Sequence, residues 1–278
     1  MYRLLALPVA TAAVYLLGPT VAPATTPAPA VAFTSVDGRQ FLEYDTRGDG
    51  RVVEAVGDLA HATRIAIVIP GVDTTLVNFD DGLGHVERRA PAFAARQLYG
   101  QMTAKTREPV AVVAWLGYDP PEGVGVAAVR EDRAAAGAAA LVSFVDTLTA
   151  AHPSAAVTVI GHSYGSVVAG LAAPRLAPNV HDIIAIGSPG MGVHSRADLH
   201  TGARVWAGTA KGDWTKWIPG VRIFGLGHGT RPADPAFGAL PLPVDGVANH
   251  DSYFVSGTGS LAAMASIAAT GDDLGARA

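Results

Sequence analysis

A strand-like run that ends in a serine between two glycines is the feature that most constrains this chain. Residues 157–160 are apolar or β-branched, and they lead into Gly161-His162-Ser163-Tyr164-Gly165 and then into small residues typical of a helix. In so tight a turn, side chains at positions 161 and 165 would collide with the neighbouring strand or helix. The serine itself then needs a strained backbone with positive φ, which lifts its Oγ above the strand ends. We therefore predict a nucleophile elbow at Ser163 rather than an ordinary glycine-rich turn.

Strand-like and helix-like segments alternate along the rest of the chain. Apolar runs typical of strands occupy 64–69, 110–115, 183–186, 204–207 and 221–224, and helical spacing occupies 91–102, 130–151 and 261–269. Turn residues between 40–44 and 51–56 predict a β-hairpin. This alternation predicts an α/β fold with a mainly parallel central sheet and helices on both faces. No second composition boundary follows, so we expect one domain over residues 31–278.

Composition narrows the function. The chain has 278 residues, 49% of them hydrophobic and 16% charged, so it can bury a sizeable core. It has no cysteine, which excludes a cysteine nucleophile, thiolate zinc sites and iron–sulfur clusters. Twenty Lys and Arg against 24 Asp and Glu give a net charge of −4 with no basic run, so we expect no nucleic-acid partner. Nucleotide-triphosphate and zinc-protease motifs do not occur, and we expect no cofactor and no metal.

Residues 1–30 differ from the rest of the chain. A single early charge, Arg3, precedes an apolar stretch at 4–17 and a run of small residues and prolines. This order is typical of an export signal, and Ala22-Pro23-Ala24 and Ala28-Pro29-Ala30 both match cleavage sites. The stretch is shorter than the roughly 20 residues of a spanning helix, and the alternative is an uncleaved N-terminal anchor. We predict a secreted or cell-envelope protein, with membrane or envelope association through this segment if it is retained.

A serine nucleophile needs a base and an acid from later in the chain. After an elbow of this kind the acid and then the histidine follow on loops after later strands. Asp213 lies on the loop after the strand predicted at 204–207, whereas Asp198 precedes that strand. Asp234 and Asp245 lie in proline-rich turns further on. We therefore predict Asp213 as the acid.

Two histidines satisfy the chain order for the base. His228 follows the strand predicted at 221–224, and His250 precedes the last helix. Spacing alone leaves both open. His194 and His200 precede the acid strand, and His162 is excluded as the base because Ser163 beside it occupies the tip of the elbow.

The loop after the strand at 64–69 is the natural second side of an oxyanion hole. Its sequence is Pro70-Gly71-Val72-Asp73-Thr74-Thr75. Gly71 lets the backbone bend close to the serine, so the N–H of Val72 and the N–H of Tyr164 can both face a developing oxyanion. Trp115, Trp206, Trp214 and Trp217 are candidates either for a substrate groove or for packing.

Several stretches in order resemble one family, over roughly residues 33–270. They are Pro70 to Thr75, Trp115-Leu116-Gly117-Tyr118-Asp119-Pro120-Pro121, Thr158 to Ser166, Gly187-Ser188-Pro189-Gly190-Met191-Gly192-Val193, Trp206 to Trp214, Gly225-Leu226-Gly227-His228-Gly229-Thr230, Asp234-Pro235-Ala236-Phe237-Gly238-Ala239 and His250-Asp251-Ser252-Tyr253-Phe254. The chain resembles the actinobacterial α/β-hydrolases of largely uncharacterised function. The resemblance implies an α/β-hydrolase fold, and it favours His250, before the terminal Tyr-Phe, as the catalytic histidine. Asp73 departs from the family, which more often has glycine there.

These observations predict a serine hydrolase of the esterase or lipase type. Ser163 attacks, His250 moves the proton, Asp213 orients the histidine, and the N–H groups of Tyr164 and Val72 hold the oxyanion. We expect a small ester or lipid-like substrate, with thioester or amide cleavage as alternatives within the same chemistry. The segment 117–127 is short and no long insertion follows Val193, so we expect a small cap or none. The rival interpretation is a non-catalytic binding protein that keeps this fold.

Overall fold

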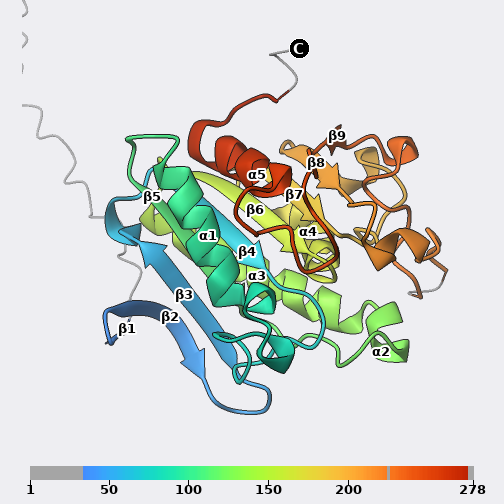
Figure 1. Cartoon of the computed structure of the whole chain (residues 1–278), viewed down its shortest axis with the longest axis horizontal. Helices are drawn as coiled ribbons and strands as arrows, with labels where there is room; N and C mark the ends of the chain where they lie inside the picture. Colours follow the sequence, from blue (N-terminus) through green and yellow to red (C-terminus); the bar gives the residue numbers. More distant parts are fainter. Residues whose placement is uncertain (1–33, 224–225, 275–278) are drawn as a thin grey trace, which may run out of the picture.

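A nine-stranded mixed sheet forms the centre of the computed structural model, which describes residues 34–223 and 226–274 (Figure 1). The strand order is β1-β2-β3-β5-β4-β6-β7-β8-β9, antiparallel from β1 to β5 and parallel from β5 to β9. The strands are β1 (Thr34–Val36), β2 (Arg39–Asp45), β3 (Arg51–Gly57), β4 (Arg64–Ile69), β5 (Val110–Leu116), β6 (Ala156–His162), β7 (Val180–Ile186), β8 (Arg204–Gly208) and β9 (Leu240–Pro241). The signal or anchor predicted at residues 1–30 lies outside the described residues and stays a prediction.

Helices cover both faces of the sheet, as the alternation of segments predicts (Figure 1). Two of them pack together on one face and two on the other, each pair over its own hydrophobic cluster. The first pair is α1 (Pro91–Thr103) with α5 (Gly259–Thr270), the second is α3 (Asp132–Ala151) with α4 (Gly165–Ala172), and the short α2 (Val126–Val129) precedes α3. The predicted α/β fold class is confirmed.

The side chains of β4 show why this sheet needs cover on both sides. Ile65, Ile67 and Ile69 belong to the cluster under α3 and α4, whereas Ala66 and Val68 belong to the cluster under α1 and α5. Successive side chains of a strand point to opposite faces, so an unbroken apolar run marks a strand buried on both faces.

α3 is the one described helix that is long and apolar enough to cross a membrane by length and composition alone. Its apolar face is nevertheless packed in the core, where Ala134, Ala138, Leu141 and Val145 are all fully buried. The helical spacing of these residues accounts for that packing. The helix therefore covers the sheet as a core helix does.

The strand order places the site. From β4 the chain crosses to β5 on one side, and from β6 it crosses to β7 on the other. The loops after β4 and β6 therefore leave neighbouring parallel strands at the point where the order reverses. In open α/β sheets this is where ligands bind.

One predicted strand is wrong over its described residues. Positions 221–223 form only an isolated bridge between Ile223 and Leu226. Val221 and Ile223 are 51% and 61% exposed, so these apolar side chains are not part of the hydrophobic core. The sheet instead continues from β8 to the two-residue β9, where Trp206 pairs with Leu240.

No helical cap covers the site within residues 34–223 and 226–274, which agrees with the expected small cap or none. Two loop regions flank the site instead: residues 117–131 with α2, and residues 213–223 and 226–231 between β8 and β9. Arg222 joins them through an ion pair with Glu131, whose Nε–Oε1 distance is 2.8 Å.

Candidate active site

Ser163 follows β6 in the tight turn that the sequence predicts. Its φ is 54°, in the left-handed region that non-glycine residues rarely adopt. A Cβ on Gly161 would lie 2.5 Å from the Ser166 backbone, and one on Gly165 would collide with the Ile69 carbonyl oxygen. Both glycines are therefore required for the approach of strand and helix. The strain at Ser163 is held by this packing and by its N–H, which donates to Ile186 O at 3.0 Å.

The loop after β4 runs directly against the serine. A Cβ on Gly71 would lie 2.7 Å from Ser163 Cβ and 3.1 Å from its Oγ. The next residue, Val72, and Tyr164 both line the same groove as Ser163. Within the described part of the chain, the N–H groups of Val72 and Tyr164 have no hydrogen-bond acceptor. Tyr164 is also the N-cap of α4, so its amide lies at the positive end of that helix.

Asp73 anchors this loop to the segment that follows β5. Its φ is 61°, and its Oδ1 accepts a 2.6 Å hydrogen bond from the N–H of Gly123. Its own N–H donates to Pro121 O at 3.0 Å. Positive φ favours glycine, which accounts for the glycine that the resembled family more often has at this position. Here the carboxylate compensates by fixing two loops to each other.

Asp213 and His250 lie in direct contact, although 37 residues separate them. The Nδ1 of His250 lies 2.9 Å from each carboxylate oxygen of Asp213, so it donates to the pair. Asp213 follows β8 and is fully buried. Three more donors reach its carboxylate: Tyr253 Oη at 2.6 Å, Thr215 Oγ1 at 2.7 Å and the Thr215 N–H at 2.8 Å.

These contacts keep Asp213 ionised. Burial opposes ionisation and would raise the pKa of the carboxyl, but the hydrogen bond from His250, its charge, and the donors from Tyr253 and Thr215 outweigh burial and lower the pKa well below its usual value. Tyr253 shows the reciprocal effect, because burial and its bond to Asp213 raise the pKa of its phenol. The carboxylate can therefore hold one tautomer of His250, with the proton on Nδ1 and a free lone pair on Nε2.

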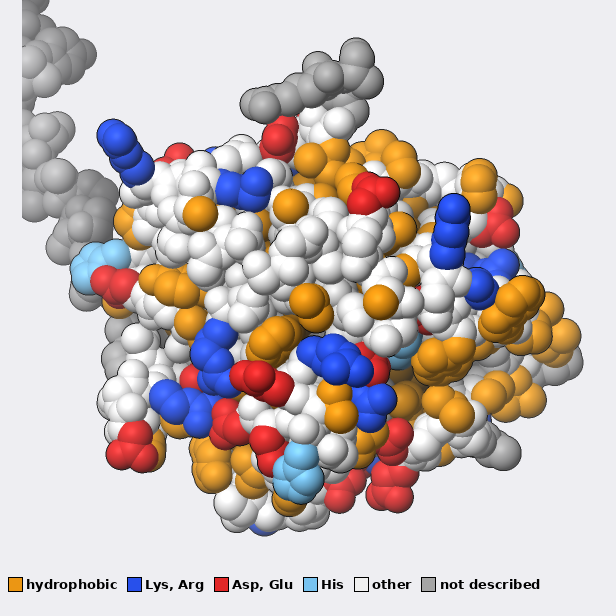
Figure 2. Space-filling view, in the orientation of Figure 1, with side chains coloured by type: hydrophobic (Ala, Val, Ile, Leu, Met, Phe, Trp, Pro, Cys, Tyr) orange, Lys and Arg blue, Asp and Glu red, His pale blue; other side chains and the backbone are white. Residues whose placement is uncertain are grey.

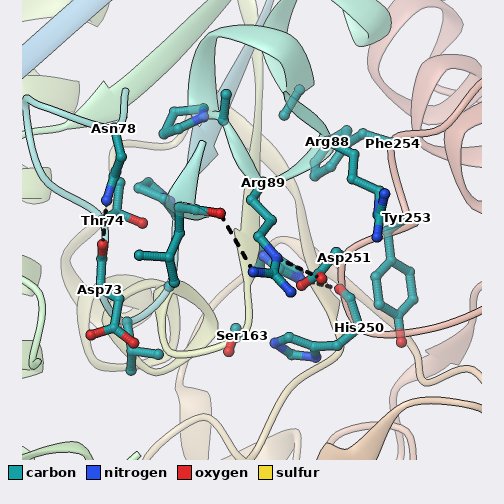
Figure 3. Close-up of a pocket in the computed structure, with 18 of the residues that line it drawn as sticks. Asp73, Thr74, Asn78, Arg88, Arg89, Ser163, His250, Asp251, Tyr253 and Phe254 are labelled. Atoms are coloured by element: carbon teal, nitrogen blue, oxygen red, sulfur yellow. Dashed lines mark hydrogen bonds and ion pairs between the residues drawn. The ribbon is translucent and has the colours of Figure 1, made fainter. Parts of the chain in front are cut away.

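The imidazole of His250 and the hydroxyl of Ser163 lie next to each other in one hollow (Figure 3). The Trp214 ring packs against His250 with its centroid 4.9 Å from that of the imidazole. Gly187, after β7, leaves room for the acid. A Cβ there would lie 2.8 Å from Asp213 Oδ2 and 3.1 Å from His250 Cε1. The structure thus brings all five predicted site residues around one point.

The two candidate histidines differ in their partners. His228 points its Nε2 at the Ala128 carbonyl oxygen, 2.6 Å away, and its ring packs edge-on against Tyr164. Its Nδ1 is buried without a partner among the described residues, and burial lowers its pKa. Only His250 contacts Asp213.

A family profile described as alpha/beta hydrolase matches residues 45–223. The chain belongs to this alpha/beta-hydrolase family. It is 30% identical over 256 residues to the "Uncharacterized protein Rv2079" of Mycobacterium tuberculosis (strain H37Rv), which covers 80% of this chain but only 37% of the relative. It is 34% identical over 161 residues to "Uncharacterized protein Rv0963c" of the same strain, which covers 55% of this chain and 58% of the relative. The family resemblance stated from the sequence is confirmed.

Solved structures show more distant likenesses to this alpha/beta hydrolase. One is XC6422 from Xanthomonas campestris, titled a member of a/b serine hydrolase without lid, with a TM-score of 0.42, 17% identity, and coverage of 77% of this chain and 86% of that one. Another is an alpha-beta serine hydrolase homologue from Coxiella burnetii, with a TM-score of 0.44, 9% identity, and coverage of 87% of this chain and 100% of that one. Likenesses this weak assign no residue a role.

His162 supports the site of this alpha/beta hydrolase in a way that sequence reasoning missed. Its Nε2–H donates to the His250 backbone carbonyl at 2.8 Å, and the two ring centroids lie 4.7 Å apart. Burial, with the nearby charge of His250, lowers the pKa of His162 to about 4, so its ring is neutral at pH 7. The bond joins residues 88 positions apart, and no sequence signal announces it.

The four tryptophans divide between packing and the site. Trp115 and Trp206 are buried in the core, whereas Trp214 lines both hollows beside Ser163 and Trp217 is 78% exposed. Among residues 34–223 and 226–274, no group of three or more His, Asp or Glu side chains could hold a metal ion.

Proposed function

We propose that this alpha/beta hydrolase is a serine esterase that works through an acyl-enzyme intermediate. The observation that carries the proposal is the contact of His250 Nδ1 with both oxygens of the buried Asp213, with the other edge of the ring beside Ser163 (Figure 3). A neutral imidazole held in one tautomer by an ionised carboxylate is what a serine hydroxyl needs to become nucleophilic.

The first half-reaction transfers the acyl group to the serine. As Ser163 Oγ bonds to the ester carbonyl carbon, His250 Nε2 takes the hydroxyl proton and Asp213 stabilises the imidazolium. The carbonyl oxygen becomes an oxyanion held by the N–H groups of Val72 and Tyr164. Each such donor contributes on the order of 3 kcal/mol to transition-state stabilisation. The imidazolium then protonates the alcohol oxygen as the C–O bond breaks.

Water completes the cycle by the same path. His250 takes a proton from a water molecule as the water oxygen attacks the acyl carbon, and then returns a proton to Ser163 Oγ as the second C–O bond breaks. The products are the free acid, the alcohol and the unchanged enzyme. Thioesters and amides can react by the same steps. An amide demands more of the imidazolium than an ester does, because its nitrogen must be protonated before the C–N bond breaks.

A fluorophosphonate probe with a reporter group tests this proposal directly. We expect covalent labelling of the folded protein, and turnover of p-nitrophenyl acetate, that both disappear in Ser163→Ala. The matched control is Ser143→Ala, which removes an exposed serine on α3 and should keep both signals. A folded wild-type protein that neither labels nor turns over any ester, thioester or amide would overturn the proposal in favour of a binding protein.

We also propose that the enzyme acts outside the cytoplasm, in the secreted or cell-envelope fraction. The pattern of residues 1–30 supports this location. N-terminal sequencing of the mature protein tests it: a start after Ala24 or Ala30 indicates export with cleavage, and an intact segment in the membrane fraction indicates an anchor. A full-length protein confined to the cytosol would contradict the proposal.

A further inference from the structure

Two hollows of opposite character meet at Ser163. One, of about 230 Å³, contains Ser163, His250 and two arginines. The other, of about 710 Å³, extends from Ser163 along residues 214–223 and 226–228. Val72, Val124 and Trp214 line both. An ester bound with its carbonyl carbon at Ser163 would therefore place one part in each hollow.

The larger hollow is an apolar groove. Its walls are mainly aliphatic, and most of these side chains are exposed: Val124, Val129, Val221, Ile223 and Leu226 are between 44% and 65% exposed. Figure 2 shows hydrophobic side chains gathered at the right of the molecule, where Figure 1 draws the loops that follow β8. Aliphatic side chains left in water around a nucleophile gain free energy when an apolar group covers them.

Two polar side chains that line the groove are bonded to backbone carbonyls, and the other ring nitrogen of His228 is buried. Tyr164 Oη donates to Arg130 O at 2.8 Å, and His228 Nε2 points at Ala128 O. No Asp, Glu, Lys or Arg is among the described residues that line the groove. Its occupant is therefore uncharged, and an alkyl chain fits a groove of this length and composition.

The smaller hollow carries positive charge at its mouth. Arg89 donates from Nε to Asp251 Oδ2 at 2.8 Å and from Nη1 to Leu83 O at 3.4 Å. Arg88 beside it is exposed, and its guanidinium has no hydrogen bond or ion pair within the described residues. A free guanidinium presents a fork of donors that matches a carboxylate or a phosphate.

The other charges of this hollow do not cancel Arg88. Asp251 is already paired with Arg89, and Asp73 lies across the hollow from the arginines with its carboxylate bonded to Gly123 N–H (Figure 3). An anion is therefore favoured on the side of Arg88 and disfavoured on the side of Asp73.

We propose that the substrate is an ester of an aliphatic acid with an alcohol that carries an oxyanion, phosphate or carboxylate. The alkyl chain lies in the apolar groove and the oxyanion binds Arg88. This inference rests on the proposed esterase function and adds to it the chemical class of both halves of the substrate.

A first experiment measures the acyl half. We expect kcat/KM for neutral p-nitrophenyl esters to rise from acetate through butyrate to octanoate, by about two- to fourfold per CH₂ while the chain still covers groove surface. Ile223→Ser should lower the octanoate value at least fivefold and leave the acetate value within twofold. The control Val36→Ser changes an exposed aliphatic side chain on β1 and should change neither. No dependence on chain length would overturn the assignment of the groove.

A second experiment measures the alcohol half with three soluble probes of equal acyl length. These are 1-octanoylglycerol, 1-octanoylglycerol 3-phosphate and 3-(octanoyloxy)propanoate, and release of octanoate is measured. We expect at least a tenfold higher kcat/KM for a charged probe over the neutral one, mainly through KM, and a decline of this preference with added salt. The ratio between the two charged probes identifies the oxyanion.

Variants of two exposed arginines complete the test. Arg88→Gln should reduce the preference for charged probes to about one while the neutral probe keeps its kcat/KM within twofold. Arg107→Gln, before β5 at the opposite edge of the sheet, should keep the preference. Equal turnover of charged and neutral probes by a wild-type protein that labels with fluorophosphonate would overturn this inference alone. Absence of both labelling and turnover would overturn the esterase proposal, and this inference with it.

Discussion

The side chain of His162 holds the backbone of His250, because its Nε2–H donates to the carbonyl oxygen of His250 at 2.8 Å. His162, directly before Ser163, therefore fixes the loop that carries His250. His250 is held at three points: by His162 at its backbone, by Asp213 at Nδ1 and by Trp214 against its ring. His162 is a positioning residue, since it acts through His250 and the chemistry needs no proton from it.

We expect His162→Ala to lower kcat about 10- to 100-fold with little change in KM, because the His250 loop loses its anchor while the groove is unchanged. His162→Gln, whose side-chain amide can donate to the same carbonyl, should recover part of the loss. Steady-state kinetics on p-nitrophenyl butyrate measure both variants. An unchanged kcat in a folded His162→Ala protein would contradict the positioning role.

The low pKa of His162 makes folding stability depend on pH. The unfolded chain binds a proton at this residue below about pH 6.5, whereas the folded protein does so only near pH 4. Between these values the unfolded state holds more protons, so the free energy of unfolding falls as pH drops from 6.5 towards 4, by about 1.4 kcal/mol per pH unit from this residue. Denaturant unfolding at several pH values should show this slope in wild type and in His181→Ala, an exposed control, and a smaller slope in His162→Ala.

Gly187→Ala should impair the acid–base pair more than it impairs the fold. Its Cβ would crowd Asp213 Oδ2 and His250 Cε1, and φ at Gly187 is 54°. We expect a fall in kcat of at least about 30-fold, because small misplacements of catalytic groups are costly. Gly48→Ala is the matched control, with φ of 61° and nothing within 4 Å of the added Cβ. It should share the backbone cost of about 1 kcal/mol and keep kcat.

Tyr253→Phe removes one donor from the Asp213 carboxylate and the acceptor of the Ala210 N–H. We expect a loss of about 1–3 kcal/mol in the free energy of unfolding, since a buried carboxylate and a buried amide each lose a partner. The value of kcat should fall about tenfold. Chemical denaturation and steady-state kinetics measure these effects. Tyr44→Phe, at a mostly exposed position, should show neither of them.

Asp73 tests the loop that carries Val72. Because φ at Asp73 is 61°, glycine fits its backbone and a β-branched residue does not. We expect kcat of Asp73→Gly to stay within about fivefold of the wild-type value. We expect kcat of Asp73→Val to be at least about tenfold lower than that of Asp73→Gly. Asp37 has a φ of 50° in the turn between β1 and β2, so Asp37→Val should cost stability and leave kcat unchanged. Equal kcat values for the two Asp73 variants would show that the conformation of this loop does not affect the reaction.

The central strands of the sheet could be predicted from the sequence. Strands such as β4, β5 and β6 are buried on both faces, and such strands are unbroken apolar runs that stand out from their surroundings. Residues 221–223 contain two aliphatic residues around Arg222, and both Val221 and Ile223 are exposed along the groove. Apolar residues in a sequence indicate that the side chains are removed from water. They do not indicate whether the hydrophobic core or a bound ligand removes them.

The candidate site was predictable where chain order constrains it. The elbow at Ser163 and the later position of Asp213 follow from local turn geometry and strand order. His228 and His250 satisfy the same order; the family resemblance favours His250, and in the structure His250 is the one of the two that contacts Asp213. His162 and Gly187 contact residues that are distant in the sequence, so their contributions to the site could not be predicted without the structure.

The wall formed by residues 213–223 and 226–231 is joined to the rest of the molecule by single contacts, among them the pair of Arg222 with Glu131, the bridge of Gly229 with Val193 and the hydrogen bond of His228 to Ala128 O. The elbow, by contrast, is locked by glycines against two strands and a helix. We therefore expect this wall to tolerate changes of sequence better than the elbow does. Replacing the wall residues should change the preferred acyl chain of the substrate and leave the positions of Ser163, His250 and Asp213 unchanged.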